Sequence, residues 1–341
     1  MPDFPSQIDL ATPGASGIVF GENDNDKAAW SLSAAGDVNG DGVGDFIVGA
    51  RYANGNTGAA YVVFGKNGSP PNLDLAKLNP SNGGFDPTQG FMIKGDNSGD
   101  AAGFSVSGTG DFNGDGFEDI VIGAPYATAR EGELNAAAGA GKVYVVFGKA
   151  SGFGTIDLGG APGNSFIVIQ GADAGDRLGY SVDFAGDVDG DGFDDLVIGA
   201  LRGDGPTVGG IYNGGEVYVI FGQGKGTEHD IDLAAGLSTA DGYLIQAASP
   251  SSYDQFGRSV AGAGDVNGDG LADFIVGAQQ ADPGGDGDAG AAYVIYGSDD
   301  FSGITLATFD SSNPTLDDPS KGFRIMGAAG GDLLGHSVDG A

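Results

Sequence analysis

Four nine-residue segments of the 341-residue chain share one arrangement of oxygen-bearing side chains. Each has Asp at positions 1, 5 and 9, Asn or Asp at position 3, and Gly at positions 4 and 6. We call these segments loops 1 to 4, and they span 37–45, 111–119, 187–195 and 265–273. Alternate residues of a tight loop can converge on one point, and hard divalent cations bind several oxygen atoms. The spacing therefore predicts a cation site in each loop.

Position 7 of each loop has no side-chain oxygen, so its backbone carbonyl is the expected fifth ligand. The glycines at positions 4 and 6 permit the sharp turn that brings this carbonyl inward. The first six positions resemble an EF-hand loop, but the last ligand here is Asp at position 9 rather than Glu at position 12. The predicted ligands are Asp37, Asn39, Asp41, Val43, Asp45, Asp111, Asn113, Asp115, Phe117, Asp119, Asp187, Asp189, Asp191, Phe193, Asp195, Asp265, Asn267, Asp269, Leu271 and Asp273.

Calcium is the ion that these loops favour. Five protein ligands, one of them able to bind through both oxygens, suit the flexible high coordination of Ca²⁺ better than the strict octahedron of Mg²⁺. Zinc is disfavoured because the loops contain neither His nor Cys. A single Asp-Gly-Asp-Gly segment is often only a β-turn, but four at one place in a repeat favour metal. We expect about four Ca²⁺, one for each loop, in a structural role.

The loops belong to a longer repeat, because their first residues follow one another at intervals of 74, 76 and 78. In the second repeat the surrounding segments are FSVSGTG, IVIGA, KVYVVFG and SFIVIQG, and the other repeats have close equivalents. All four segments are strand-sized, rich in β-branched and aromatic residues, and bounded by Gly, Asn or Asp. The middle two are nearly continuous apolar runs, which predicts strands buried on both faces.

The predicted fold is therefore all-β, a β-propeller-type array of four-stranded blades. A β-helix is disfavoured because its coils are much shorter than these repeats. Residues 16–20 resemble a fourth strand without its blade, and 327–341 resemble the start of a further repeat. We expect a fragment of a longer array, or half of an assembly that closes with another chain. The repeats span about 21–94, 95–170, 171–246 and 247–326.

The composition narrows the class of partner. With 47 acidic and 14 basic residues the formal net charge is −33, which disfavours nucleic acid and anionic membrane surfaces. The chain has no Cys, so it forms neither disulfides nor thiolate metal sites. The sequence contains no run of 18 apolar residues, so we expect no segment that inserts into a membrane. The N-terminal residues show no signal peptide, so we expect export after its removal or by another signal.

The Phe/Tyr-x-Ser-Val segments, the four loops and Gly123-Ala124-Pro125 together resemble FG-GAP repeats, the blades of the integrin α-subunit β-propeller. The resemblance covers nearly the whole chain. It implies that each loop joins the first two strands of a blade and binds one Ca²⁺ through positions 1, 3, 5, 7 and 9. Integrin propellers have seven blades with calcium loops in only some, whereas all four complete repeats here carry one.

This resemblance implies a non-catalytic protein, secreted or at the cell surface, that serves adhesion or recognition of a protein or glycan partner. An extracellular location also fits the metal, since sites with dissociation constants of about 10⁻⁴–10⁻³ M fill outside a cell and stay mostly empty inside it. Two alternatives stay open. The chain could be a structural component that self-associates through open strand edges, or the propeller domain of a larger secreted enzyme.

Other motifs carry less weight. Only His229 and His336 are present, so nucleophile–base pairs are scarce, and the recurring Gly-x-Ser occupies equivalent places in successive repeats, which indicates strand packing. Arg202-Gly203-Asp204 is the tripeptide that integrins recognise, but chance explains it in a chain rich in Gly and Asp. The segment 282–288 is best explained as a solvated acidic turn.

Overall fold

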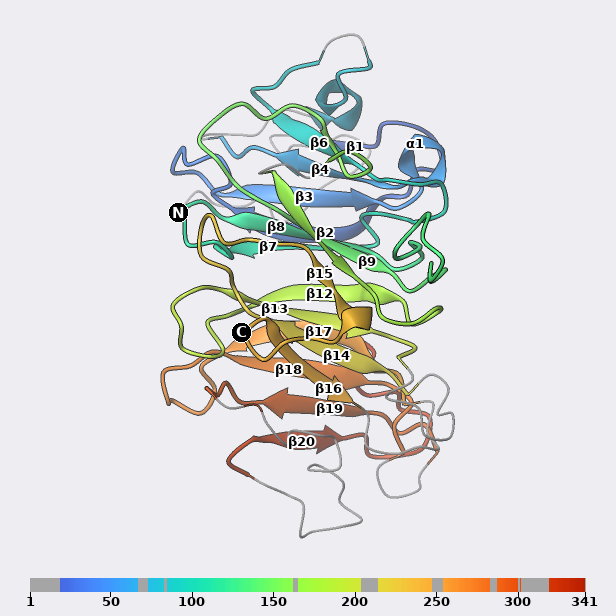
Figure 1. The fold of residues 1–341 in the computed structure, drawn as a ribbon, viewed down its shortest axis with the longest axis vertical. Coiled ribbons are helices and arrows are strands. Elements are labelled where there is room, and N and C mark those ends of the chain that lie inside the picture. Colours follow the sequence, from blue (N-terminus) through green and yellow to red (C-terminus); the bar gives the residue numbers. More distant parts are fainter. Residues whose placement is uncertain are drawn as a thin grey trace, which may run out of the picture.

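A computed structural model of the chain describes residues 19–66, 73–82, 85–161, 165–203, 214–246, 254–282, 287–299, 301 and 319–340. Within these residues nearly all regular structure is β-strand, arranged as four antiparallel blades. The blades follow one another along the long axis of the molecule (Figure 1). The prediction of an all-β array of four-stranded blades is confirmed.

Each blade is a meander of four strands in chain order. Blade 1 contains β2 (Ala28–Gly36), β3 (Asp45–Ala50), β4 (Ala59–Val63) and β6 (Gly90–Lys94). Blade 2 contains β7 (Ser105–Gly110), β8 (Asp119–Ala124), β9 (Lys142–Val146) and β11 (Phe166–Gln170). Blade 3 contains β12 (Leu178–Gly186), β13 (Asp195–Ala200), β14 (Glu216–Ile220) and β16 (Gly242–Gln246). Blade 4 contains β17 (Phe256–Gly264), β18 (Asp273–Ala278), β19 (Ala291–Ile295) and β20 (Gly322–Met326).

The first strands of the four blades lie side by side, β2 next to β7, β7 next to β12, and β12 next to β17. The fourth strands β6 and β20 lie toward the upper and lower ends of the view in Figure 1. First strands on the inside and fourth strands on the outside are the arrangement of propeller blades.

Four shorter strands lie outside these meanders, namely β1 (Val19–Phe20), β5 (Leu73–Asp74), β10 (Ile156–Asp157) and β15 (Ile231–Asp232). In the sequence, each of the last three comes between the third and fourth strands of its own blade. There β10 pairs in parallel with β6 of the preceding blade, and β15 pairs likewise with β11. Two sheets consequently have five strands rather than the four that the repeat predicts. The helical elements are α1 (Ala53–Asn56), η1 (Leu75–Leu78) and η2 (Leu233–Ala235).

Both partial repeats stand where the repeat pattern expects them. Strand β1 pairs in parallel with β5 as β6 does with β10, so it takes the place of a fourth strand; residues 16–18 lie outside the described residues. At the other end Leu334 bridges Gly290 in the way that Leu178 bridges Gly141. Leu334 therefore stands where the first strand of a next blade begins.

The core lies between the blades. In β8, Ile120 and Ile122 pack in the cluster shared with blade 1, whereas Val121 packs in the cluster shared with blade 3. Strand β13 repeats the pattern, with Leu196 on one side and Val197 on the other. A strand with period-two geometry needs apolar residues at every position when both of its faces are covered. This is why the second and third segments of each repeat are continuous apolar runs.

The first and second strands of one blade pack closely on the first strand of the next blade. This packing explains the recurring Gly-x-Ser and Gly-Ala. The hydroxyl of Ser105 donates to the carbonyl of Gly179 in the next blade (2.8 Å). The same bond joins Ser31 to Gly103, Ser181 to Gly257 and Ser259 to Gly335 at 2.9, 2.8 and 3.1 Å. A Cβ on Gly123 would lie 2.1 Å from the Gly179 oxygen, so only glycine fits there.

Candidate metal centres

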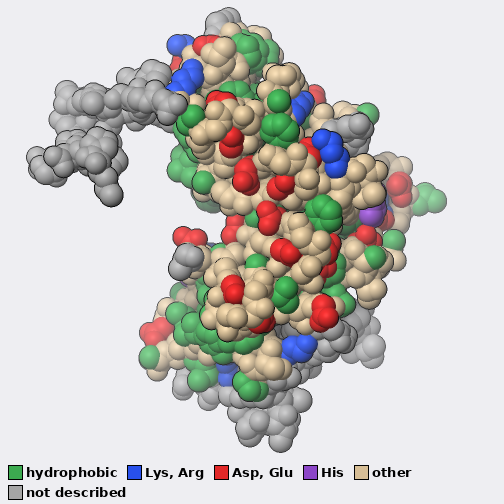
Figure 2. All heavy atoms as spheres, turned by 90° about the vertical axis from the view of Figure 1, so that its left-hand side faces the viewer, with side chains coloured by type: hydrophobic (Ala, Val, Ile, Leu, Met, Phe, Trp, Pro, Cys, Tyr) green, Lys and Arg blue, Asp and Glu red, His purple; other side chains and the backbone are tan. Residues whose placement is uncertain are grey.

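All four loops occupy the same place in their blades. Each begins directly after the first strand and ends at the first residue of the second, as in loop 2 between β7 and β8. They therefore share one edge of the array. This edge lies on the left of Figure 1, where strand β3 begins. Figure 2 looks onto this side, and acidic side chains follow one another along it.

A common set of hydrogen bonds shapes each loop. The carboxylate at position 1 accepts the backbone N–H of the glycine at position 6, at 2.7, 2.8, 2.9 and 3.0 Å in loops 1 to 4. The carboxylate at position 5 accepts the N–H of position 7, at 2.9, 3.1, 2.9 and 2.9 Å. All glycines at positions 4 and 6 have φ between +67° and +95°, which side chains rarely adopt. The turn is thus closed around its own carboxylates.

The aspartate at position 9 ties the loop to the third strand of its blade. One oxygen each of Asp45, Asp119, Asp195 and Asp273 accepts the N–H of the glycine that follows that strand, at 2.8 Å in every blade. These four side chains are buried, at 4% exposure or less. A buried carboxylate needs hydrogen bonds or a cation to compensate its lost hydration.

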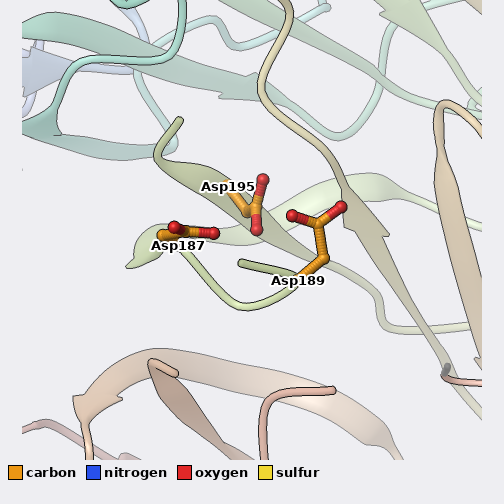
Figure 3. A group of neighbouring side chains, drawn as sticks. All are labelled: Asp187, Asp189 and Asp195. Atoms are coloured by element: carbon orange, nitrogen blue, oxygen red, sulfur yellow. The ribbon is translucent and has the colours of Figure 1, made fainter. Parts of the chain in front are cut away.

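Loop 3 brings three of its carboxylates together. One oxygen of each of Asp187, Asp189 and Asp195 lies within 4.8 Å of the other two, and the three side chains surround a common space (Figure 3). Asp191 accepts the Phe193 N–H in the same turn. The other three loops have Asn at position 3, and within the described residues no second group of three acidic or His side chains is this compact.

Burial raises the pKa of three of the position-9 carboxylates. It raises the pKa of Asp119 and of Asp195 to about 8, and that of Asp45 to about 6, with neighbouring loop carboxylates adding to the increase. The Oδ2 atom of Asp119 is buried and has no hydrogen-bond partner. An orphaned buried carboxylate oxygen, surrounded by further carboxylate and amide oxygens, is the donor set that a hard divalent cation fits.

The next blade covers loops 1 to 3 but not loop 4. The position-2 carbonyls of Val38, Phe112 and Val188 accept an N–H from the following blade, at 3.0, 2.9 and 2.8 Å, and all three side chains are fully buried. The equivalent Val266 is 49% exposed. The loops are therefore part of the blade interfaces rather than free turns.

Neighbouring loops also touch one another. A Cβ on Gly40 would lie 2.5 Å from the ring of Phe117, and one on Gly114 would lie 2.5 Å from the ring of Phe193. The side chain at position 7 thus packs on the glycine at position 4 of the preceding loop. Position 4 needs glycine for space as well as for its positive φ, a requirement that the sequence pattern alone does not reveal.

Three residues that the sequence analysis did not single out contribute to this edge. Asp194, at position 8 of loop 3, accepts the N–H of Asp111 in loop 2 (2.8 Å). Lys225 of blade 3 binds Asp115 of loop 2 (3.1 Å). Asp183 in β12 accepts a hydrogen bond from Ser107. None has a motif signature, because each acts on a residue of another repeat.

The remaining motifs lie elsewhere. His229 Nε2 lies 3.2 Å from Asp241, and His336 Nδ1 lies 2.7 Å from the Gln279 side-chain oxygen. Of Arg202-Gly203-Asp204, the aspartate lies outside the described residues, as do 283–286 of the acidic turn.

The segments that match a known protein family coincide with the first three strands of each blade. The FG-GAP repeat family matches residues 28–63, 102–146, 178–220 and 256–295, each of which runs from the first strand of a blade, through its loop, to the third strand. The chain is an FG-GAP repeat protein. Its four FG-GAP repeats coincide with the four blades, so the resemblance seen in the sequence is confirmed.

Several curated proteins are similar to this FG-GAP chain. Integrin alpha-PS2 of Drosophila melanogaster is 34% identical over 239 residues, which are 70% of this chain and 14% of that protein. Integrin alpha-V of Gallus gallus is 29% identical over 273 residues, 79% of this chain and 21% of that protein. Phosphatidylinositol-glycan-specific phospholipase D of Homo sapiens is 33% identical over 181 residues, 51% of this chain and 18% of the enzyme. The chain thus matches only a small part of each relative. No helix in its described part is both long and apolar enough to span a bilayer.

Proposed function

We propose that this FG-GAP array is an extracellular, non-catalytic recognition module whose blades are stabilised by calcium, one ion in each of the four loops. The observation that carries the proposal is the shared loop geometry. In all four turns the position-1 carboxylate accepts the position-6 N–H, the position-5 carboxylate accepts the position-7 N–H, and the position-9 carboxylate is buried. Positions 1, 3, 5 and 9 would supply side-chain oxygens, and position 7 its carbonyl.

The calcium would act on stability. Without a cation each loop holds three or four carboxylates close together, and the position-9 carboxylate is buried as well. Occupancy of one site at about 100 times its dissociation constant stabilises the folded state by about 2.7 kcal/mol. Since loops 1 to 3 contact the following blade, bound calcium would also hold neighbouring blades together. Sites of extracellular affinity would fill outside a cell, which supports a secreted or cell-surface protein.

The recognition role is supported by the matches to integrin alpha subunits and by exposed aromatic residues. Trp30, Tyr52 and Tyr126 are 47%, 39% and 36% exposed, at the strand ends opposite the loops. The Arg51 guanidinium stacks 3.5 Å from the centroid of the Trp30 ring. Exposed aromatic and arginine side chains are enriched where proteins bind partners. A protein or glycan partner would contact this edge.

The test is metal counting together with thermal unfolding, in excess Ca²⁺ and after chelation. We expect about four Ca²⁺ per chain, as one site in each loop implies, and a large loss of thermal stability on chelation. Asp187→Ala should remove one ion, whereas Asp24→Ala, an exposed aspartate outside the loops, should remove none. Equal melting curves with no bound metal would refute the proposal.

A second candidate comes from the match to phosphatidylinositol-glycan-specific phospholipase D. The same calcium-stabilised blades could accompany a catalytic domain as its propeller. The two candidates differ in what the exposed aromatic edge contacts. Pull-down with the isolated catalytic domain of such a phospholipase would capture the chain only under the second candidate.

A further inference from the structure

Blade 3 reaches back onto loop 2 through the connection that follows β14. The N–H of Gln223 donates to the carbonyl of Phe112 (2.9 Å), and the N–H of Lys225 donates to the carbonyl of Asn113 (2.8 Å). These two backbone bonds hold the connection along positions 2 and 3 of the loop. The side chain of Lys225 therefore starts from a fixed place beside the proposed cation site.

The Lys225 ammonium lies on a carboxylate of that site. Its Nζ atom is 3.1 Å from Oδ2 of Asp115, at position 5 of loop 2. The other oxygen of Asp115 already accepts the Phe117 N–H (3.1 Å). Oδ2 is accordingly the Asp115 oxygen left to bind a cation, and Lys225 occupies it. The Lys225 side chain is 67% exposed, so it can move away into solvent.

Loop 2 differs in this respect from the other loops. Of the ion pairs between described residues, the Lys225–Asp115 pair is the one that includes a loop carboxylate. In loop 4 the corresponding oxygen of Asp269 accepts a hydrogen bond from Asn267 within the same loop (2.7 Å). By position in the repeat, Ser151 stands in blade 2 where Lys225 stands in blade 3.

We propose that Lys225 is an intramolecular competitor for the cation of loop 2 and lowers the calcium affinity of that site alone. The inference rests on the proposed calcium function. A bound Ca²⁺ would either displace the ammonium, which loses its ion pair with Asp115, or share the carboxylate with it, which brings two cations close together. The Lys225 side chain is 67% exposed and screened by solvent, whereas the Asp115 side chain is only 8% exposed. Removing the ammonium should therefore tighten calcium binding at loop 2 by at least about twofold to fivefold, the effect of an exposed pair.

The experiment needs a readout for each loop. The position-6 amides of Gly42, Gly116, Gly192 and Gly270 each donate to the first carboxylate of their own loop, so their NMR shifts report on each site separately. We would titrate the chain with Ca²⁺ and compare wild type with Lys225→Met. The matched control is Lys149→Met, because the Lys149 ammonium lies over the Phe153 ring (5.2 Å) rather than at a loop.

Lys225→Met should lower the calcium midpoint of the Gly116 amide and leave the other three midpoints unchanged. Lys225→Arg should behave as wild type, and Lys149→Met should change none of the four. The difference between wild type and Lys225→Met should shrink as salt is raised, which a purely structural role would not cause. Four titrating amides with an unchanged Gly116 midpoint would overturn the competitor role. If no glycine amide titrates in wild type, the calcium proposal itself fails.

Discussion

The carboxylate of Asp183 accepts a hydrogen bond from the hydroxyl of Ser107 (2.5 Å), and its second oxygen accepts the Gly262 N–H (3.0 Å). Ser107 lies in β7, Asp183 in β12 and Gly262 in β17, so one side chain joins three blades. Burial raises the pKa of Asp183, and these hydrogen bonds partly offset the increase. A charged group in this interface is retained because its oxygens are satisfied on both sides.

Removing this carboxylate should weaken both blade interfaces. We expect Asp183→Ala to lower the free energy of unfolding by about 2–3 kcal/mol, since two hydrogen bonds to a charged acceptor are lost. Urea unfolding in saturating Ca²⁺ measures this, with Asp24→Ala as the exposed control. A double-mutant cycle with Ser107→Ala should give a coupling energy of about 1 kcal/mol. Additive effects of the two substitutions would mean that the bond contributes nothing.

Glycine at the Gly-Ala segment should be irreplaceable. A Cβ on Gly199 would lie 2.0 Å from the Gly257 carbonyl and 2.4 Å from the Ser181 hydroxyl oxygen. We expect Gly199→Ala to destabilise the chain by about 2 kcal/mol or more, because the blades must separate to admit the methyl group. The control is Gly154→Ala, where nothing lies within 4 Å. Comparable melting temperatures for the two variants would contradict the close packing.

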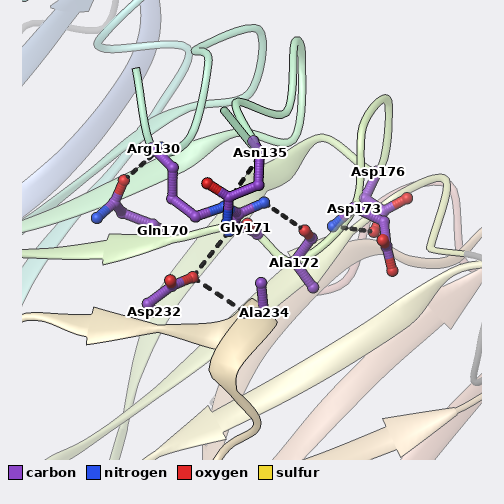
Figure 4. Close-up of polar contacts among 9 residues, drawn as sticks. All are labelled: Arg130, Asn135, Gln170, Gly171, Ala172, Asp173, Asp176, Asp232 and Ala234. Atoms are coloured by element: carbon purple, nitrogen blue, oxygen red, sulfur yellow. Dashed lines mark hydrogen bonds and ion pairs between the residues drawn. The ribbon is translucent and has the colours of Figure 1, made fainter. Parts of the chain in front are cut away.

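A buried guanidinium anchors the long connection between β8 and β9 to blade 3. Arg130 donates to Asp232 Oδ1 (2.8 Å) and to the carbonyls of Gly171 (3.1 Å) and Ala172 (2.8 Å), as Figure 4 illustrates. Its side chain is 5% exposed. We expect Arg130→Met to cost about 3 kcal/mol, because it leaves buried acceptors without a donor.

The comparison for Arg130 is Lys94→Met. Lys94 pairs with Asp157 (3.0 Å), the equivalent of Asp232 in the neighbouring blade, but this pair is 40% and 51% exposed. An exposed pair contributes about 1 kcal/mol at most. Urea midpoints should therefore fall clearly for Arg130→Met and hardly for Lys94→Met. The reverse order would show that burial of the pair does not govern its contribution.

The metal-free protein should lose stability as the pH rises. The pKa of Asp119 and of Asp195 is raised to about 8, and that of Asp45 to about 6, from the ordinary aspartate value of 3.8, mainly by burial. Between pH 4 and 8 the folded state then binds more protons than the unfolded state, so the free energy of unfolding falls across this range. Calcium binds the deprotonated carboxylates and should oppose the fall.

Urea midpoints at pH 5, 7 and 8.5, with calcium-stripped and calcium-saturated protein, test this dependence. The stabilisation by calcium should grow with pH, and Asp119→Asn should flatten the metal-free decline. If the metal-free midpoint instead rises between pH 5 and 8.5, the loop carboxylates are not held neutral by burial.

The repeat, the strands and the loops could be predicted because their signals are local. Continuous apolar runs such as 120–122 indicate strands covered on both faces, and the Asp-Gly pattern of 111–116 requires a tight turn in any tertiary context. Even the places of β1 and Leu334 followed from alignment with the other repeats. The four loops share their hydrogen bonds because the residues that make them lie within nine positions of one another.

Tertiary structure alone decided which side chains meet across blades. Arg130 and Asp232 are 102 residues apart, Lys225 and Asp115 are 110 apart, and Ser107 and Asp183 are 76 apart. The first two contacts depend on connections whose lengths and sequences differ from blade to blade, so no period in the sequence marks them. Ser107 and Asp183 occupy equivalent positions of successive first strands, but the other repeats do not have this Ser–Asp pair. The packing of Phe117 on Gly40 belongs to the same class, because it exists only once two blades dock. Local backbone preferences determined the blade, and the side chains that reach the next blade determined how the blades are joined.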